Sequence, residues 1–249
     1  MRRIYLSDCK IEGEKIYIKG ETLHYIKNVL RLMPEDMFIG FDGKGLEYTL
    51  VIKHINNNII YTEIKEKRKI FKTESDIEII LCIALTKNRI FDRVIEKAAE
   101  MGVKRIIPVK TARSIIDIEK ENIKYKIIRW KKLLSEGSKI SGSAEIPDII
   151  SPLSFQDAVN IKTDYSIFFW EQAETPLKNI FSNIKIVPEL KIKIFIGPEG
   201  GFTEEEAEIA KNSGAFIVSL GKRILRVETA AIVALGIIFY QIESKKINI

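Results

Sequence analysis

Two glycine-bearing segments near the end of the chain combine residue types that suit ligand binding. The first, residues 197–202, reads GPEGGF and follows the apolar run 192–196. Glycines at such a position let a ligand approach backbone N–H and C=O groups. No Lys follows them and Glu199 lies among them, so this is not a phosphate-binding loop of the P-loop type. The pattern favours a cationic or zwitterionic ligand, and the alternative is a tight strand-to-helix turn without a ligand.

The second segment, residues 219–231, reads SLGKRILRVETAA and also lies between an apolar run and a predicted helix. Arg226 and Glu228 are the charged residues at the start of that helix, where backbone N–H donors are unpaired. A salt bridge at the helix start is the alternative for these two residues. Because ligands in α/β sheets bind beyond the carboxyl ends of strands, two such segments predict a shared pocket.

The elements that must hold these segments alternate between strand and helix from residue 77 onward. Strands are predicted over 77–85, 105–109, 166–170, 192–196 and 216–220, and helices over 89–101, 123–140, 203–212 and 229–242. Gly102 and Gly214 are helix stops, and Thr203 with Glu206 forms a capping box. This alternation predicts an α/β fold with a mainly parallel sheet and helices on both faces.

The first 70 residues follow a different pattern of short β-rich runs and turns. Strands are predicted over 16–18, 37–39, 46–52 and 59–64, and one helix over 21–30. This pattern predicts a small β-barrel that carries one helix. The polar stretch 65–76 is predicted to be a linker, so the domains are predicted as 1–72 and 73–249.

The charge balance suits a polyanionic partner. The 249 residues include 40 Lys and Arg against 34 Asp and Glu, a net charge of +6, and residues 1–72 account for +4 of it. An Ile-, Lys- and Asn-rich composition, as an AT-rich genome gives, is the alternative explanation. Two Cys and two His are too few for a zinc site, and no metal is expected. With no apolar run long enough for a membrane span and no signal peptide, we expect a soluble cytoplasmic protein.

The two C-terminal motifs, GPEGGFTEEE and LGKRILRVETAA, resemble those of the ribosomal small-subunit RNA uridine-N3 methyltransferases, a family of the SPOUT class. Weaker matches are HYIKNVLR at 24–31, RVIEKAAEMG at 93–102 and RWKK at 129–132, so the resemblance covers nearly the whole chain. One departure follows the central helix, where Ile140 and Ser143 stand in place of the family's usual Gln and Arg. This departure bears on RNA affinity or site choice more than on the reaction.

The resemblance implies an N-terminal PUA-like β-barrel, a C-terminal trefoil-knotted parallel sheet, and a homodimer. It implies S-adenosylmethionine as the cofactor and N3 of a uridine in 16S rRNA of the small ribosomal subunit as the methylated atom. Arg226 is then the candidate that stabilises negative charge on the uridine. Glu228 is a candidate base, but an orienting salt bridge to Arg226 is the favoured role for it. Residues implied for the cofactor are Trp170, Glu171, Ile196, Gly197, Glu199, Gly200, Gly201, Leu220, Gly221, Leu225, Thr229 and Ala230, and those for RNA are Arg2, Arg3, His24, Lys27 and Arg31.

Two other functions stay open at this point. One is a different SPOUT activity such as ribose 2′-O methylation, and the other is a non-catalytic RNA-binding protein. A nucleotide-hydrolysing enzyme is disfavoured because the glycine-rich segment has no P-loop Lys. His54, Trp130 and Cys82 are expected to be packing residues, as is Trp170 if it does not bind the cofactor.

Overall fold

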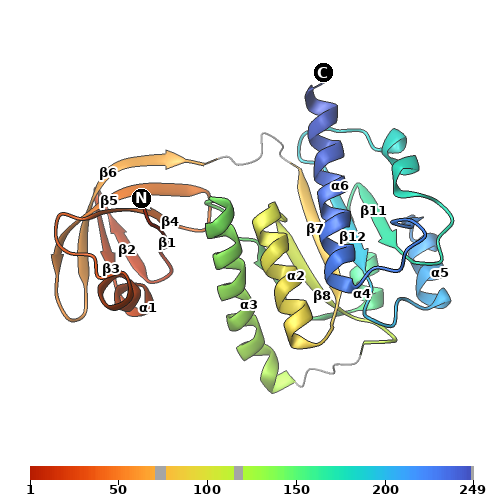
Figure 1. Cartoon of the computed structure of the whole chain (residues 1–249), viewed down its shortest axis with the longest axis horizontal. Coiled ribbons are helices and arrows are strands. Elements are labelled where there is room, and N and C mark those ends of the chain that lie inside the picture. The colour runs from red at the N-terminus through yellow and green to blue at the C-terminus, as the bar shows by residue number, and fades with distance from the viewer. Residues whose placement is uncertain (71–76, 115–119, 248–249) are drawn as a thin grey trace. The chain divides into compact units, whose positions relative to one another are not determined.

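The computed structural model describes residues 1–70, 77–114 and 120–247 (Figure 1). The chain divides into two compact units. The first contains Met1–Lys72 together with Ser138–Ile146, and the second contains Thr73–Gly137 with Pro147–Ile249. The domain boundary expected at residue 72 stays a prediction, and the sequence pattern did not anticipate that 138–146 groups with the first unit.

The first unit is built on a curled six-stranded sheet in the order β1-β4-β5-β6-β3-β2. β1 and β4 are parallel and the other pairs are antiparallel. Alternating apolar residues fill its interior, among them the fully buried Ile16, Phe38 and Leu50. The strands are β1 (Arg3–Tyr5), β2 (Cys9–Glu12), β3 (Lys15–Ile18), β4 (Met37–Phe41), β5 (Leu46–Ile55) and β6 (Ile60–Lys69).

Two features of the first unit differ from the sequence pattern. The predicted helix 21–30 is a short α-helix, α1 (Gly20–His24), continued by a π-helical turn, η1 (Tyr25–Val29). The linker was predicted to start at residue 65, which is too early, because β6 continues to Lys69 and remains paired with β5. Residues 65–69 are polar because they are exposed strand residues, not because they are unpaired. The remainder of the predicted linker, 71–76, lies outside the described residues.

The second unit contains a seven-stranded sheet in which every pairing is parallel. The order is β10-β8-β7-β12-β11-β13, with β9 beside β8. The central strands β7 and β12 are mostly apolar and buried because helices cover both faces of the sheet. The strands are β7 (Glu78–Ala84), β8 (Arg105–Lys110), β9 (Asp148–Ile149), β10 (Leu153–Ser154), β11 (Tyr165–Phe169), β12 (Lys191–Ile196) and β13 (Phe216–Val218).

The helices of this unit follow the predicted pattern with small shifts at their ends. They are α2 (Asn88–Met101), α3 (Lys120–Ser141), α4 (Phe155–Asn160), the 3₁₀ helix η2 (Leu177–Asn183), α5 (Glu204–Asn212) and α6 (Val227–Ile247). α2 packs on α6, while α4 and α5 pack together on a cluster that includes Phe168, Phe195 and Phe202 (Figure 1). The predicted parallel α/β sheet is therefore confirmed. The short elements β9, β10, α4 and η2 were not predicted, and the knot implied by the resemblance stays a prediction.

A buried lysine fixes the end of α4 against the sheet. The Lys193 side chain in β12 is almost fully buried, and its Nζ donates to the carbonyl oxygens of Ala158, Val159 and Ile161 at 3.0, 2.8 and 2.7 Å. These carbonyls are at the C-terminal end of α4, where a helix has unpaired acceptors and favours positive charge. Burial lowers the pKa of the Lys193 amine.

Candidate functional site

The two glycine-bearing segments emerge from the same edge of the parallel sheet. β12, β11 and β13 are consecutive in the sheet, so the loops that follow them all lie at its carboxyl edge. The loop after β11 is hydrogen-bonded to the segment after β13: Trp170 N donates to Val218 O at 2.9 Å, and Ser219 N donates to Thr175 O at 2.9 Å. The predicted convergence of loops at one edge thus has a structural basis.

The glycine-rich loop after β12 is in close contact with the loop after β11 at Gly201. Gly201 has a φ of +69°, which L side chains rarely adopt, and its N–H donates to Pro198 O at 2.9 Å. A Cβ on Gly201 would lie 2.3 Å from Glu171 Oε1. On Gly197 a Cβ would lie 3.1 Å from the ring of the buried Phe202. Both glycines therefore allow a close approach that a larger residue would disturb.

A fourth strand contributes a residue that sequence reasoning missed. Arg113 follows β8, and its Nη1 donates to Gly200 O at 2.8 Å and to Phe202 O at 3.4 Å. A Cβ on Gly200 would meet the Arg113 side chain at an ordinary 3.5 Å. The only sequence signal was the position of a charged residue just beyond a buried strand. Arg113 holds the glycine-rich loop through its backbone carbonyls.

The capping box at the start of α5 is confirmed and has a second task. Thr203 Oγ1 accepts from Glu206 N at 3.1 Å, and Glu206 Oε2 accepts from Thr203 N at 3.0 Å. The other carboxylate oxygen, Glu206 Oε1, accepts from Ala112 N at 2.8 Å. Glu206 therefore ties the loop after β8 to the helix that follows the glycine-rich loop.

The segment after β13 leads into α6 with its charged residues at the helix start. The Arg226 carbonyl accepts from Ala230 N at 2.8 Å, the first turn of α6 contains Glu228, and the Arg226 side chain is exposed. In the part of the chain that the structure describes, no hydrogen bond or ion pair involves the side chain of Arg226 or Glu228. The salt bridge considered from the sequence is therefore not formed among the described residues.

The other residues expected at the cofactor lie along the same edge. Ile196 is buried at the end of β12, Trp170 is half-buried beyond β11, and the carboxylates of Glu171 and Glu199 are exposed. Trp170 Nε1 is buried and finds no acceptor among the described residues. Beyond β13, Gly221 has a φ of +117°. Leu220, Leu225 and Ala230 are half-buried and Thr229 is exposed.

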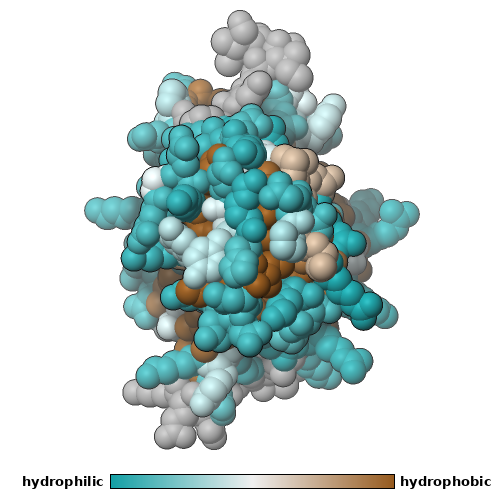
Figure 2. Space-filling model, turned by 90° about the vertical axis from the view of Figure 1, so that its left-hand side faces the viewer, coloured by the Kyte–Doolittle hydropathy of each residue, from teal (hydrophilic) through white to brown (hydrophobic). Residues whose placement is uncertain are grey.

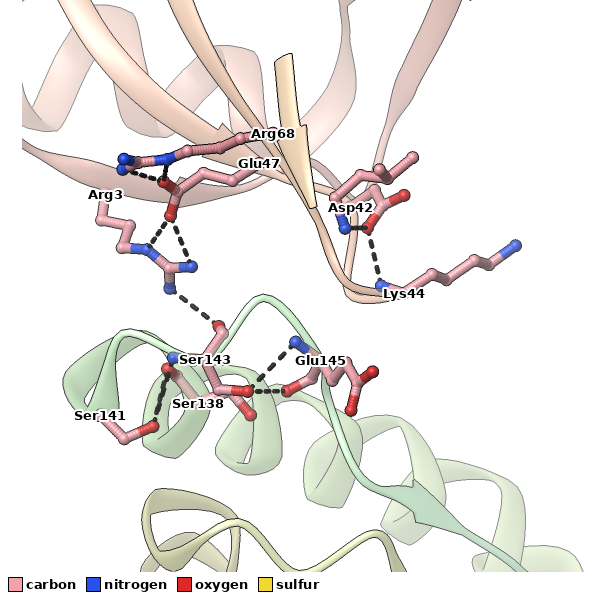
Figure 3. A network of polar contacts seen from close by, with 10 residues as sticks. Arg3, Asp42, Lys44, Glu47, Arg68, Ser138, Ser141, Ser143 and Glu145 are labelled. Atoms are coloured by element: carbon pink, nitrogen blue, oxygen red, sulfur yellow. Dashed lines mark hydrogen bonds and ion pairs between the residues drawn. The ribbon is translucent and has the colours of Figure 1, made fainter. Parts of the chain in front are cut away.

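Arg3 differs from the other residues expected at RNA because its side chain has partners within the chain (Figure 3). Its side chain is only 13% exposed, and Nε donates to Glu47 Oε2 at 2.8 Å. Nη1 donates to the backbone oxygen of Ser143 at 2.9 Å, and the guanidinium lies 4.3 Å from the centre of the Phe41 ring. Glu47 is buried and also accepts from Arg68. The half-buried Arg3 thus compensates the buried Glu47 carboxylate, which would be costly there without a partner, and its role in RNA binding stays a prediction.

The other four residues expected to bind RNA lie at or near the surface of the first unit. Arg2 is exposed and its Nη1 donates to Leu30 O at 2.8 Å, which places it beside the exposed Arg31. His24 is exposed, and the half-buried Lys27 donates to Asn57 Oδ1 at 3.3 Å. Figure 2 views the molecule from the side of this unit, and that face is mostly hydrophilic with small hydrophobic patches. The RNA-binding role of these residues stays a prediction.

Of the residues expected to be packing residues, two are confirmed. Trp130 is buried with its ring 4.7 Å from that of Phe91. Cys82 is fully buried, and burial raises the pKa of its thiol to about 12. His54 is exposed, so the expectation is wrong for that residue; its ring lies 5.8 Å from that of Tyr61 at the surface. Within 1–70, 77–114 and 120–247, no group of three or more His, Cys, Asp or Glu is placed to hold a metal.

The fold and the edge just described define an α/β protein whose loops gather at the carboxyl edge of a parallel sheet, with a curled N-terminal sheet in a separate unit. A family described as the RNA methyltransferase domain matches residues 73–239, and one described as the RNA methyltransferase PUA domain matches residues 18–65. The chain therefore belongs to the RNA methyltransferase family, and the PUA-like N-terminal domain expected from the sequence is confirmed.

Similar proteins cover nearly the full chain. Ribosomal RNA small subunit methyltransferase E of Bacillus subtilis is 29% identical over 98% of this chain and 98% of its own. The protein of the same name from Buchnera aphidicola is 31% identical over 94% and 90%. A Legionella pneumophila methyltransferase solved with bound SAM has a TM-score of 0.86, 27% identity and 96% coverage of both chains. The Neisseria gonorrhoeae ribosomal RNA small subunit methyltransferase E bound to S-adenosyl methionine has a TM-score of 0.83, with 26% identity over 96% and 97%.

Proposed function

We propose that the protein transfers a methyl group from S-adenosylmethionine to N3 of a uridine in 16S rRNA of the small ribosomal subunit, in the cytoplasm. The observation that carries the proposal is the meeting of the loops after β12, β11 and β13 at one edge of the parallel sheet. Similarity to ribosomal RNA small subunit methyltransferases over nearly the full chain supports the proposal. Two similar solved structures contain this cofactor, which supports it further.

The residues at this edge fit the cofactor. S-adenosylmethionine has a positively charged sulfonium and an apolar ring with hydrogen-bonding edges. The Glu171 carboxylate lies against Gly201, and a carboxylate near the sulfonium would attract it electrostatically. The unpaired indole N–H of Trp170 is a buried donor that needs an acceptor, which a bound ligand can provide. The half-buried Leu225 provides apolar surface.

We assign the cofactor to residues from all three loops. When bound, it supplies a methyl group activated on the sulfonium. The glycine-rich loop presents its backbone groups, and Arg113 keeps the Gly200 carbonyl in place. The residues that would hold the cofactor are Trp170, Glu171, Ile196, Gly197, Glu199, Gly200, Gly201, Leu220, Gly221, Leu225, Thr229 and Ala230.

We assign Arg226 to the uridine. N3 carries a proton that must leave before N3 can accept a methyl group, and the negative charge then spreads over the two carbonyl oxygens of the base. The exposed Arg226 guanidinium has five N–H donors and no protein partner in the described residues, so its donors are available for those oxygens. Charge stabilisation of this kind lowers the barrier, because it is strongest where charge develops.

Glu228 is the carboxylate we assign to the N3 proton. It lies in the first turn of α6, two residues after Arg226, and no ion pair within the described chain holds the two together. In this assignment the proton passes from N3 to a carboxylate oxygen of Glu228, and N3 gains the methyl group. The sequence alone favoured an orienting role for Glu228, which would require the ion pair that this protomer does not form.

We propose that residues 1–72 form the RNA-binding domain and that Arg2, His24, Lys27 and Arg31 contact phosphates. These residues are exposed or half-buried on one unit of the chain. Phosphate contacts position an RNA without reading its sequence. Arg3 is left out of this set because its guanidinium already pairs with Glu47.

We also propose that two copies associate through α6. This helix is apolar, yet it exposes Ile232 (40%), Ile237 (37%) and Tyr240 (67%). Its segment Val227–Ser244 is long and apolar enough to cross a membrane, but such helices also occur in soluble proteins, and α6 packs on α2. Association of two copies through this face would remove these apolar side chains from water. A monomer in sedimentation equilibrium at micromolar concentration contradicts the proposal.

Nucleoside mass spectrometry of 16S rRNA tests the reaction. The rRNA from a strain that lacks this protein should have lost one N3-methyluridine, and the purified protein with S-adenosylmethionine should restore it. Loss of a ribose-methylated nucleoside instead would mean 2′-O methylation. An unchanged nucleoside profile together with intact RNA binding would mean a non-catalytic RNA-binding protein.

A further inference from the structure

One helix, α3, concentrates positive charge. α3 has seven Lys and Arg against two Glu, a net charge of +5, while the whole chain has +6. The rest of residues 73–249 is therefore acidic overall, since that whole segment has a net charge of +2. A concentration of charge on one element is the electrostatic feature expected of a surface that binds a polyanion.

The inner face of the first part of α3 packs on α2. Trp130 and Leu134 are buried, and a Cβ on Gly137 would lie 2.3 Å from Glu96 O, so the two helices are in close contact there. The Phe91 and Trp130 rings are also in contact, and Figure 1 shows α3 alongside α2. This packing leaves the opposite side of α3 facing outward from its own unit.

The outward side combines lysines with two large apolar side chains. Tyr125 is 76% exposed and Ile128 is 67% exposed. Residues three, four and seven apart lie on one side of a helix, so these side chains share a stripe with three exposed lysines. We call this the α3 stripe, and its members are Lys124, Tyr125, Ile128, Lys131 and Lys132. The neighbouring Arg129 is held by an ion pair to Asp92 and is not counted in it.

The α3 stripe lies toward the sheet edge that carries the loops of the candidate site. α2 begins just after β7, at the carboxyl edge of the sheet. Contacts pair the early part of α2 with the middle of α3 and a later part of α2 with Gly137, so the two helices run in the same direction. The N-terminal half of α3, which contains the stripe, is therefore on the side of the glycine-rich loop.

We propose that the α3 stripe binds RNA next to the methylated nucleotide, an inference that rests on the proposed function. Lys124 and Lys131 contact phosphates, and Tyr125 stacks on an unpaired base. A second copy of the chain fits less well, because a symmetric contact through α3 would bring two surfaces of the same charge together.

RNA binding by charge-matched variants tests the proposal. The full chain is titrated with a fragment of small-subunit rRNA over a range of salt concentrations. The double variant Lys124→Gln/Lys131→Gln should weaken binding about tenfold or more, and the slope of log affinity against log salt should fall by about 1 for each lysine. The control Lys162→Gln/Lys185→Gln removes two exposed lysines of the same unit elsewhere and should leave both values unchanged.

Tyrosine variants test the stacking part. Tyr125→Ala should weaken RNA binding about tenfold, the effect of removing one stacked ring, whereas Tyr125→Phe should bind like the wild-type protein. Both should bind S-adenosylmethionine with unchanged affinity in calorimetry and unfold at the wild-type temperature, because Tyr125 is exposed.

A salt slope of the Lys124→Gln/Lys131→Gln variant equal to that of its control would overturn the inference. So would a change in the oligomeric state of this variant, or its loss of binding to an acidic protein while its RNA affinity is kept. The outcome is separable from that of the proposed function. If the wild-type protein binds rRNA but methylates none of it, and the lysine variant still loses affinity, the proposed reaction fails and the α3 stripe stands.

Discussion

Substitution of Gly201 by Ala tests whether the contact between the loops after β12 and β11 builds the cofactor site. Gly201 has a φ of +69°, and an added Cβ would lie 2.3 Å from Glu171 Oε1. The Glu171 side chain is exposed and flexible, so it can move away at small cost to the fold. That movement would take its carboxylate away from the place proposed for the sulfonium.

The cost to stability can be worked from the backbone and matched with a control. An L residue in the left-handed region costs about 1–2 kcal/mol, and the stiffer unfolded chain of Ala offsets about 0.4–1 kcal/mol of this. Gly102 ends α2 with a φ of +95° and has nothing within 4 Å of an added Cβ. Gly201→Ala and Gly102→Ala should therefore each lower the free energy of unfolding by about 1 kcal/mol.

The affinity for S-adenosylmethionine should separate the two variants. Losing an exposed carboxylate partner is worth up to about 1 kcal/mol, so calorimetry should show a dissociation constant about fivefold higher for Gly201→Ala. Gly102→Ala should bind like the wild-type protein. Adding Glu171→Ala to Gly201→Ala should cost little more, because the same interaction has already been lost. Equal affinities of the two alanine variants would refute the reasoning.

Three further substitutions have defined outcomes. Arg226→Ala should lower kcat about 10²–10³-fold with the cofactor dissociation constant nearly unchanged, as for loss of one donor to developing charge, and equal losses in both would argue against that role. Arg113→Met keeps the aliphatic stem but removes the donor to Gly200 O. Hydrogen exchange of the Gly201 amide should become faster and the affinity for the cofactor should fall. Unchanged exchange would show that Arg113 does not hold the loop. Lys193→Met leaves three carbonyls at the end of α4 without their donor and should lower the free energy of unfolding by about 1–3 kcal/mol, as denaturant titration can measure. Because the pKa of Lys193 is lowered in the folded state, the unfolded chain binds the proton more tightly. The difference in free energy of unfolding between the wild-type protein and Lys193→Met should therefore grow as pH rises toward 10.5. A difference that stays constant with pH would contradict the burial of charge.

The features that could be predicted from the sequence are those decided by neighbours along the chain. Mostly apolar segments such as Ile192–Ile196, in which Lys193 is the one polar residue, are long enough to specify buried strands, and glycines mark the loop that follows this one. The capping box of Thr203 and Glu206 is a pattern over four residues, and both of its hydrogen bonds are present. Two such loops at strand ends were sufficient to predict that they would share an edge.

The features that could not be predicted depend on partners far away in the sequence. Arg113 meets Gly200 across 87 positions, and nothing near either residue indicates the pairing. A basic residue near the N-terminus is typical of a phosphate contact, yet Arg3 pairs with Glu47, 44 positions later, in a buried site. The polar end of β6 was predicted as a linker because exposed strand residues and linker residues have similar composition.

The residues that depart from the family pattern, Ile140 and Ser143, lie in the segment 138–146, which groups with the first unit. The segment that contains it is attached to the first unit mainly through its backbone: Gly45 N donates to Ala144 O at 3.0 Å, Ile146 N donates to Gly43 O at 3.0 Å, and Arg3 binds the backbone oxygen of Ser143. The Ser143 side chain is itself buried and accepts from Glu145 N at 3.2 Å. The attachment therefore forms without the Arg that the family usually has at this position.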